Sequence, residues 1–218
     1  MQKIAIVILN TKINQKVFDF YYNPNVFLIC ADGGANRLYE YKKEIIPKCI
    51  IGDLDSLKPE IQDYYQQQNC SIVKIDDQDT SDFEKALSYI QQLDGFQRII
   101  IIGGLTERFD QTINSLHTLV KFNFTGELIS DYSIVRYFNQ GIHTFQFSEI
   151  EQSKGISLFP QGTQARINTK GLKWNVTQNN PLILGKFLST SNEAIEKQLE
   201  FDSLDNFFFV TQLKDEYI

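Results

Sequence analysis

The stretch RIIIIGG (Arg98–Gly104) contains four consecutive isoleucines followed by two glycines. A strand with one wet face alternates apolar and polar residues, whereas an unbroken apolar run is typical of a strand covered on both faces. Such strands belong to parallel sheets that carry helices on either side. The stretch therefore predicts a parallel α/β sheet, with the glycines at the turn that leaves the strand.

The first part of the chain repeats this alternation of apolar runs and helical patterns up to about residue 138. Other apolar runs are Ile4–Leu9, Val26–Cys30, Cys49–Ile51, Ser71–Ile75, Glu127–Ile129 and Ile134–Phe138. Helical patterns cover Asn36–Lys43, Pro59–Gln67, Phe83–Leu93 and Gln111–Phe122, and in the last we expect Ile113, Leu116, Leu119 and Val120 to form the apolar face. Strands alternating with helices predict a Rossmann-like, mostly parallel α/β/α domain over residues 1–138.

Short β-like segments separated by turn residues make up the rest of the chain, residues 139–218. They are Ile142–Phe147, Gly155–Phe159, Ala165–Thr169, Leu182–Leu188 and Asn206–Leu213. Glycine and Asn-Pro turn signals separate them, and the one candidate helical period covers Asn192–Leu199. This pattern predicts a smaller all-β domain, a β-sandwich. The fold class is therefore α/β plus all-β.

Composition restricts the class of protein. The chain has 218 residues and a formal net charge of -6 at pH 7, which argues against nucleic acid as the main partner, since binding it needs a basic face. The three cysteines show no metal-ligand spacing and suit a reduced, cytoplasmic protein. The N-terminal apolar run Ile4–Leu9 is too short to span a membrane, so we expect no membrane association.

Acidic residues follow the predicted strands at four places. Asp32 follows the second strand, Asp53 and Asp55 the third, Asp82 precedes a helix, and Asp110 follows the Gly103-Gly104 turn. Because the carboxyl ends of parallel strands meet at one sheet edge, these carboxylates converge there and repel one another unless they hold a cation. The series predicts a magnesium and phosphate site. With one residue between them, Asp53 and Asp55 would point to the same side of an extended segment.

Each acidic segment also has a purely structural interpretation. Asp53 and Asp55 suit a turn followed by a helix cap, and Ser81 with Glu84 fits a capping box ahead of the helix that Asp82 begins. Arg108 and Asp110 could be a surface ion pair or a phosphate-binding cation and a further oxygen ligand. No GxxxxGK[ST] or GxGxxG motif is present, so the phosphate site is not of the Walker or dinucleotide type.

The segments ADGGANRLYE (31–40), IGDLDSLKPE (51–60), DDQDTSDFEKAL (76–87), GGLTERFDQ (103–111), GLKWNVT (171–177) and LSTSN (188–192) occur in this order. Together they resemble the eukaryotic thiamine pyrophosphokinase family over nearly the whole chain. The resemblance implies a transferase and kinase that moves pyrophosphate from ATP to the hydroxyl of thiamine, giving thiamine diphosphate and AMP. It also implies Mg²⁺ as cofactor and a homodimer with active sites shared between subunits.

The resemblance further implies roles for individual residues. By analogy, Asp53, Asp55 and Asp82 hold magnesium, and Asp110 lies close to thiamine; Asp82 or Asp110 could accept the hydroxyl proton. The residues matched to the ATP and phosphate side are Asp32, Asn36, Gln78 and Arg108. The residues matched to the thiamine side are Trp174, which stacks on thiamine, together with Ser191 and Asn192. Without the resemblance, a lone tryptophan in a small β domain is more often part of the core than a platform for a ligand, although a flat aromatic bordered by polar residues could stack on a cationic ring.

Two other functions are compatible with the same sequence. The first is a thiamine or nucleotide-binding sensor that has the same fold but does not turn over its ligand. The presence of all four acidic segments argues against a sensor, because a sensor could lose some of its metal ligands. The second is a magnesium-dependent phosphatase that uses Asp53-Leu54-Asp55-Ser56 as its nucleophile motif. Those enzymes place that motif after their first strand, whereas here it follows about the third.

Overall fold

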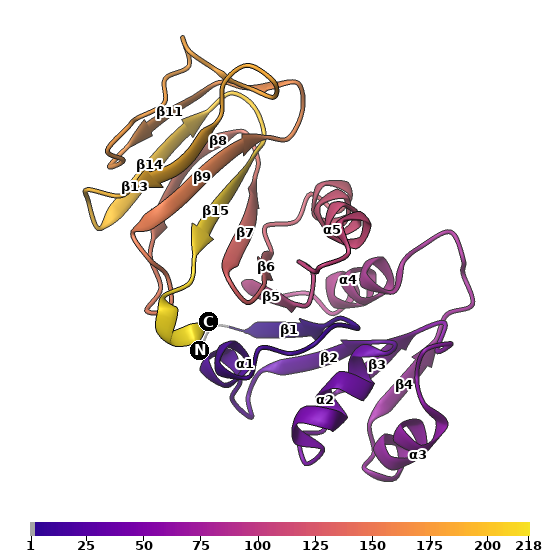
Figure 1. Cartoon of the computed structure of the whole chain (residues 1–218). Helices are drawn as coiled ribbons and strands as arrows, with labels where there is room; N and C mark the ends of the chain where they lie inside the picture. Colours follow the sequence, from indigo (N-terminus) through magenta and orange to yellow (C-terminus); the bar gives the residue numbers. More distant parts are fainter. Residues whose placement is uncertain (1–2) are drawn as a thin grey trace. The chain divides into compact units, whose positions relative to one another are not determined.

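The computed structural model describes residues 3–218, and the chain divides into two compact units, Met1–Ser130 and Asp131–Ile218 (Figure 1). The division falls just before strand β7 (Ser133–Phe138), while the sequence pattern put the change of architecture directly after that strand. Within residues 3–218, no helix has the length and apolar character needed to cross a membrane.

A parallel sheet forms the centre of the first unit, as the isoleucine run predicts. Its order is β6-β5-β1-β2-β3-β4, and every pairing in it is parallel. The strands are β1 (Ile4–Ile8), β2 (Phe27–Ala31), β3 (Cys49–Gly52), β4 (Ser71–Lys74), β5 (Arg98–Ile102) and β6 (Glu127–Ile129). The four isoleucines of β5 are at most 3% exposed, which confirms a strand covered on both faces.

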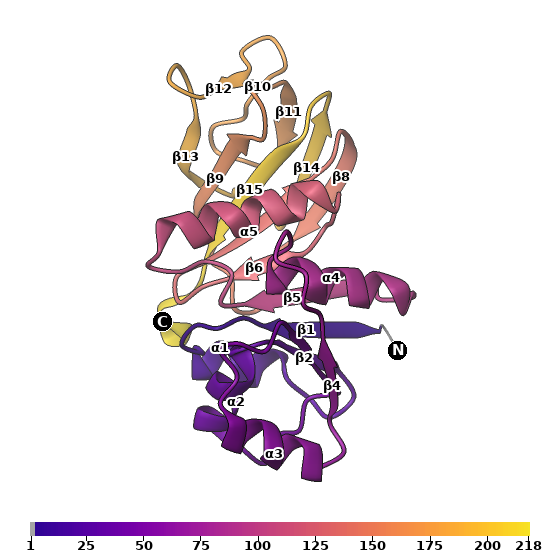
Figure 2. The ribbon, with the colours of Figure 1, turned by 90° about the vertical axis from the view of Figure 1, so that its right-hand side faces the viewer.

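Helices cover both faces of this sheet. In Figures 1 and 2, α1 to α3 lie on one face, and α4 and α5 lie on the other. They are α1 (Gln15–Tyr21), α2 (Gly34–Lys42), α3 (Pro59–Gln67), α4 (Asp82–Gln92) and α5 (Phe109–Lys121). The sequence pattern located α2 to α5 to within two residues at each end but missed the short helix α1.

The apolar face expected for α5 is only partly correct. Leu119 is buried, but Ile113 is 47% exposed, and the helix buries Ser115 and Thr118 instead. The hydroxyl of Thr118 donates a hydrogen bond to the carbonyl of Asn114 over 2.8 Å, so its burial leaves no unsatisfied donor. A hydroxyl residue such as Thr118 can therefore belong to a buried face that a count of apolar residues does not detect.

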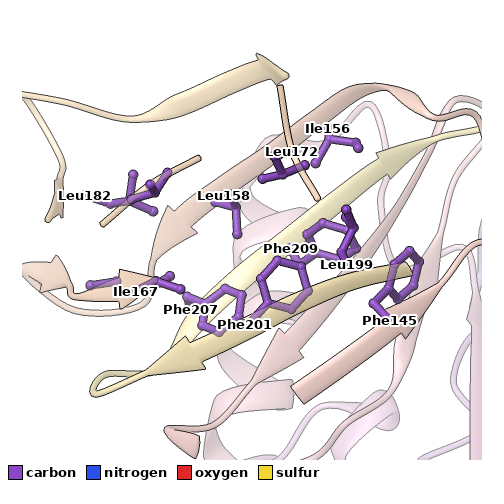
Figure 3. Close-up of a cluster of buried hydrophobic side chains, with 12 residues drawn as sticks. Phe145, Ile156, Leu158, Ile167, Leu172, Leu182, Leu199, Phe201, Phe207 and Phe209 are labelled. Carbon is purple, nitrogen blue, oxygen red and sulfur yellow. The ribbon is translucent and has the colours of Figure 1, made fainter. Parts of the chain in front are cut away.

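The second unit is a β-sandwich, as predicted. In one layer the strands have the order β13-β9-β15-β7 with antiparallel pairings, the other layer is a sheet of order β11-β14-β8, and β10 pairs with β12. Apart from β7, the strands are β8 (Gly141–Gln146), β9 (Lys154–Pro160), β10 (Gln164–Ala165), β11 (Ile167–Lys170), β12 (Leu182–Ile183), β13 (Ser189–Glu193), β14 (Gln198–Ser203) and β15 (Phe207–Gln212). Figure 3 shows the core that they enclose, which includes Phe145, Phe201, Phe207 and Phe209. A short 3₁₀ helix, Asp215–Tyr217, ends the chain.

The helical period considered at Asn192–Leu199 is wrong. Residues up to Glu193 belong to β13, and Gln198 begins β14. In β14, Leu199, Phe201 and Ser203 are buried while the residues between them are exposed. This period of two, which continues beyond the short window, is the pattern of a strand with one covered face.

Candidate functional site

Three aspartates meet at the edge of the parallel sheet where strands β2 and β3 end. Asp32 follows β2, Asp53 follows β3, and Asp82 is the first residue of α4. One carboxylate oxygen from each lies within 4.8 Å of the others. The sequence predicted convergence at this edge, but with Asp55 as the third metal ligand and Asp32 on the nucleotide side. In the structure Asp32 completes the group, and Asp55 is not part of it.

Gly52, the last residue of β3, makes this close approach possible. A Cβ atom at this position would lie 2.8 Å from Cβ of Asp32 and 2.9 Å from Oδ1 of Asp82. Neither distance is compatible with normal van der Waals contact, so a side chain here would force the two aspartates apart. The glycine is therefore required by the packing of the carboxylates around it.

Hydrogen bonds hold Asp53 in place. Its backbone N–H donates to Oδ1 of Asp82 over 3.3 Å. Its carboxylate accepts bonds from the N–H of Asp55 and from Nε2 of Gln78, each over 3.1 Å. These donors, first the Asp55 N–H and then Gln78, hold the pKa of Asp53 below its ordinary value. Gln78 thus lies beside the acidic cluster, and Asp53 remains ionised at neutral pH.

Asp32 is in the opposite situation. It is 3% exposed, and burial raises its pKa above the ordinary value for an aspartate, although N–H groups oppose this. Its Oδ2 accepts a hydrogen bond from the backbone N–H of Ser56 over 3.2 Å. Its Oδ1 is buried and has no hydrogen-bond partner in the described part of the chain. A cation would satisfy this oxygen, and the all-carboxylate donor set suits a hard divalent ion.

Lys85, which lies one turn beyond Asp82 on α4, is not among the site residues predicted from the sequence. The side chain of Lys85 is only 3% exposed, and its Nζ lies 3.1 Å from Oδ1 of Asp82. A buried ammonium therefore lies beside one of the three clustered carboxylates. The spacing of three residues between Asp82 and Lys85 was the available signal, because such residues are neighbours on a helix.

Asp55 lies at the exposed rim of the cluster. Its Oδ1 accepts a hydrogen bond from the hydroxyl of Ser56 over 2.9 Å. The expectation of an extended Asp53-Leu54-Asp55 segment is wrong, because Leu54 has φ 67°, in the left-handed region. The alternation of side chains along a strand therefore does not apply here.

Asn36 holds the loop that carries these aspartates. Its Nδ2 donates to the carbonyl of Ser56 over 2.8 Å, and its Oδ1 accepts from the N–H of Lys58 over 3.1 Å. Both ends of the buried amide are thus used by the loop backbone. The capping box predicted at Ser81 and Glu84 is confirmed and fixes the start of α4, where Asp82 lies.

Arg108 and Asp110 form an ion pair at the start of α5. Nη2 of Arg108 lies 2.5 Å from Oδ2 of Asp110, and Nε lies 3.2 Å from Oδ1. The pair lowers the pKa of Asp110 and raises that of Arg108. Both side chains are more than 60% exposed, at 71% and 63%. The pair is accessible to an anion, and its hydrogen bonds do not run to the three clustered aspartates.

Trp174 lies on the surface of the second unit and not in its core, with 56% of the residue exposed. Asn192 is buried and forms two hydrogen bonds with the backbone of Trp174. Its Oδ1 accepts from the N–H of Trp174 over 3.2 Å, and its Nδ2 donates to the carbonyl of Trp174 over 2.8 Å. Nζ of Lys173 lies 4.5 Å from the centre of the indole ring. The neighbouring Ser191 is exposed and has φ 54°. The ring is therefore presented to solvent and already attracts a cation.

Two family models match the chain, one for each unit. The model described as "Thiamin pyrophosphokinase, catalytic domain" matches residues 18–129, and that described as "Thiamin pyrophosphokinase, vitamin B1 binding domain" matches residues 142–204. The first match covers the acidic cluster and the Arg108–Asp110 pair, and the second covers Trp174 with Ser191 and Asn192.

Curated relatives and solved structures agree with these matches. Thiamine pyrophosphokinase 1 of Oryza sativa subsp. japonica is 29% identical over 233 residues, covering 97% of this chain and 88% of the rice protein. Thiamin pyrophosphokinase 1 of Caenorhabditis elegans is 26% identical, covering 89% and 82%. The thiamin pyrophosphokinase structure from Candida albicans has a TM-score of 0.85 at 22% identity, covering 98% of this chain and 90% of that one, so it shows a shared fold. The chain belongs to the thiamin pyrophosphokinase family.

Proposed function

We propose that this enzyme transfers the pyrophosphoryl group of ATP to the hydroxyl of thiamine, giving thiamine diphosphate and AMP, in a reaction that depends on Mg²⁺. The proposal is carried by one observation: Asp32, Asp53 and Asp82 bring carboxylate oxygens within 4.8 Å of one another at the carboxyl ends of parallel strands. This is the edge at which α/β folds bind ligands.

Asp32, Asp53 and Asp82 would hold the magnesium ion, with Asp55 at the exposed rim of the same site. The buried, unpartnered Oδ1 of Asp32 and the close packing around Gly52 support this assignment. When bound, the ion neutralises charge on the phosphate oxygens of ATP and orients them. Gln78, bonded to Asp53, and Asn36, which holds the Ser56–Lys58 loop, keep these ligands in place.

Arg108 and Asp110 would act on the transferred group and on its acceptor. Pyrophosphoryl transfer spreads negative charge over the phosphate oxygens, and a guanidinium offers two parallel donors to them. Arg108 is exposed and needs only to exchange Asp110 for phosphate. Asp110, released from that pair, would bind or orient thiamine close to the phosphates.

Trp174 would bind thiamine, whose thiazolium ring carries a permanent positive charge. The exposed indole, held by Asn192 and approached by Lys173, is a suitable surface for such a ring. Ser191 borders the same edge. The protein is further proposed to be a cytoplasmic homodimer with active sites shared between subunits; the three buried free cysteines support a reducing compartment.

The test is to incubate the purified protein with ATP, MgCl₂ and thiamine and to separate the nucleotides and thiamine compounds. AMP and thiamine diphosphate in equal amounts are expected. Formation of ADP, or of free phosphate without AMP, contradicts the reaction. Binding of thiamine and ATP without any turnover would favour a sensor.

Shared active sites can be tested by mixing Asp53→Asn with Trp174→Ala after dissociation and reassociation. The assay uses thiamine well below the raised KM of Trp174→Ala, where both variants have low activity. Mixed dimers would contain one active site without either substitution, so partial recovery of activity is expected. A monomer by light scattering, or no recovery in a mixture shown to contain mixed dimers, contradicts the shared sites.

A further inference from the structure

Lys85 is a buried cation that donates a hydrogen bond to the carboxylate of Asp82. Its side chain is 3% exposed, and its Nζ contacts Oδ1 of Asp82 over 3.1 Å. That oxygen also accepts the backbone N–H of Asp53, so the ammonium lies at the point where two members of the acidic cluster meet. Burying an ammonium costs free energy unless its charge is compensated, so negative charge near Lys85 must offset the cost of its desolvation.

The acidic cluster supplies the compensation. One oxygen from each of the three carboxylates lies within 4.8 Å of the others, so the ionised carboxylates repel one another and a nearby positive charge reduces this repulsion. Lys121, the last residue of α5, provides a contrast. Nζ of Lys121 lies 2.9 Å from Oε1 of Glu84, a buried residue that is not part of the acidic cluster. The side chain of Lys121 is 46% exposed. Of these two lysines, Lys85 is the one that combines burial with contact to a clustered aspartate.

We propose that Lys85 is a positioning residue, the resident counter-charge that holds Asp32, Asp53 and Asp82 together before Mg²⁺ binds. This inference rests on the proposed magnesium site. Lys85 keeps the metal-free cluster assembled, and it weakens the binding of the metal because two cations then share the same carboxylates. Lys85 therefore lowers the affinity for Mg²⁺ but keeps the metal site assembled before the ion binds.

This role has two consequences of opposite sign. Removing the charge of Lys85 destabilises the metal-free protein, because the carboxylates lose their compensation. It also tightens Mg²⁺ binding, because the metal no longer meets a positive charge a few ångströms away. A lysine that serves only packing would lower both quantities or leave the metal affinity unchanged. A lysine that binds ATP phosphate would weaken ATP binding without altering the affinity for Mg²⁺ alone.

The experiment compares Lys85→Met with the unchanged protein and with Lys121→Met as a matched control. Methionine has a similar length and no charge, so the buried volume is nearly kept. Thermal unfolding in EDTA and calorimetric titration with MgCl₂, without nucleotide, give stability and metal affinity for the full chain. For Lys85→Met we expect Tm in EDTA to fall by about 5 °C and Mg²⁺ to bind about tenfold more tightly. Lys121→Met should leave Mg²⁺ affinity unchanged within about twofold, since Lys121 contacts no clustered aspartate.

Unchanged or weaker Mg²⁺ binding by Lys85→Met overturns the proposal. If Lys85→Met is unfolded in EDTA, the titration is replaced by refolding in millimolar MgCl₂. Recovery of the folded state supports the proposal, because a divalent cation can replace the missing charge; failure to recover contradicts it. If the unchanged protein shows no Mg²⁺ binding at all, the proposed metal site fails, which is a different result from the failure of Lys85 alone.

Discussion

The backbone N–H of Ser56 donates a hydrogen bond to Oδ2 of Asp32 over 3.2 Å and so joins the end of β2 to the loop that follows β3. This bond fixes the carboxylate, while its other oxygen, Oδ1, is buried and has no hydrogen-bond partner among residues 3–218. The orientation of Asp32 is therefore set by the protein before any ligand arrives. Preorganised donors of this kind reduce the cost of binding, because little has to move when the ligand enters.

Gly52→Ala tests whether the cluster depends on close packing. The new Cβ would lie within 3 Å of both Asp32 and Asp82, so we expect the two carboxylates to separate. Unfolding free energy should fall by about 1–3 kcal/mol, as for other overpacked buried sites, and Mg²⁺ affinity should fall with it. Calorimetric titration with MgCl₂ measures the second effect. Gly162→Ala is the control, because a Cβ at Gly162 meets nothing within 4 Å. Unaltered Mg²⁺ binding by Gly52→Ala would show that the cation is held elsewhere.

Asp55→Asn separates function from stability. Asp55 is exposed, and its carboxylate accepts a hydrogen bond from the Ser56 hydroxyl, so the free energy of unfolding should change by less than about 0.5 kcal/mol. If Asp55 binds the metal–nucleotide complex at the rim of the site, kcat should fall by at least about tenfold. Full activity would remove Asp55 from the proposed ligands and leave the site to the clustered three.

The parallel sheet and its acidic edge could be predicted from the sequence because they follow from apolar runs and from strand ends. The conformation of Asp53-Leu54-Asp55 could not, since it depends on the left-handed φ of Leu54, which is an unusual conformation for a leucine and leaves no trace in residue spacing. Lys85 was missed for a related reason. A lysine within an acidic helix end normally suggests a solvated face, and only the tertiary packing buries it.

The strands of the second unit could be predicted where the alternation of apolar and polar residues was long enough to be distinguished from a helical period. The short window Asn192–Leu199 crosses the end of β13, a turn and the start of β14, so its apolar residues mimic a helical period by chance. The position of Trp174 was also open in the sequence. Its exposure depends on the amide of Asn192, eighteen residues away, which holds the loop backbone.

Trp174→Ala and Asn192→Ala should therefore give different results. Because the indole is 56% exposed, Trp174→Ala should change the free energy of unfolding little and raise KM for thiamine about tenfold, the size expected for a lost cation–π contact. Asn192→Ala removes buried hydrogen bonds to the Trp174 backbone and should cost about 1–3 kcal/mol of stability as well. Steady-state kinetics with varied thiamine and thermal unfolding measure both. Equal effects on stability would contradict the division of roles between the two residues.

The buried cysteines give a prediction about pH. Burial raises the pKa of Cys49 to about 11 and that of Cys70 to about 12, so both thiols stay protonated in the folded protein at pH 8. We expect no reaction with a thiol-specific dye at pH 8 until urea unfolds the chain. In the unfolded state the thiols ionise near their ordinary pKa of about 9, before those of the folded state. The contribution of these groups to stability is therefore complete below about pH 9 and is lost as the pH rises from there through the folded-state pKa values of about 11 and about 12. Rapid labelling of the folded protein at pH 8 would show that the cysteines are accessible.

From the ion pair between Arg108 and Asp110 we predict that substitutions of the two residues affect ATP binding and kcat differently. In the absence of nucleotide the guanidinium is neutralised by Asp110 through two hydrogen bonds. Asp110→Asn removes this competition, so the affinity for ATP should rise by a few-fold even though kcat falls, because the proposed thiamine contact is lost. Arg108→Met should weaken ATP binding and lower kcat together. Since both side chains are more than 60% exposed, neither variant should shift the unfolding transition measurably. ATP binding by calorimetry and kcat by AMP release distinguish the two variants. Weaker ATP binding by Asp110→Asn would mean that this carboxylate supports the nucleotide site instead of competing for its arginine.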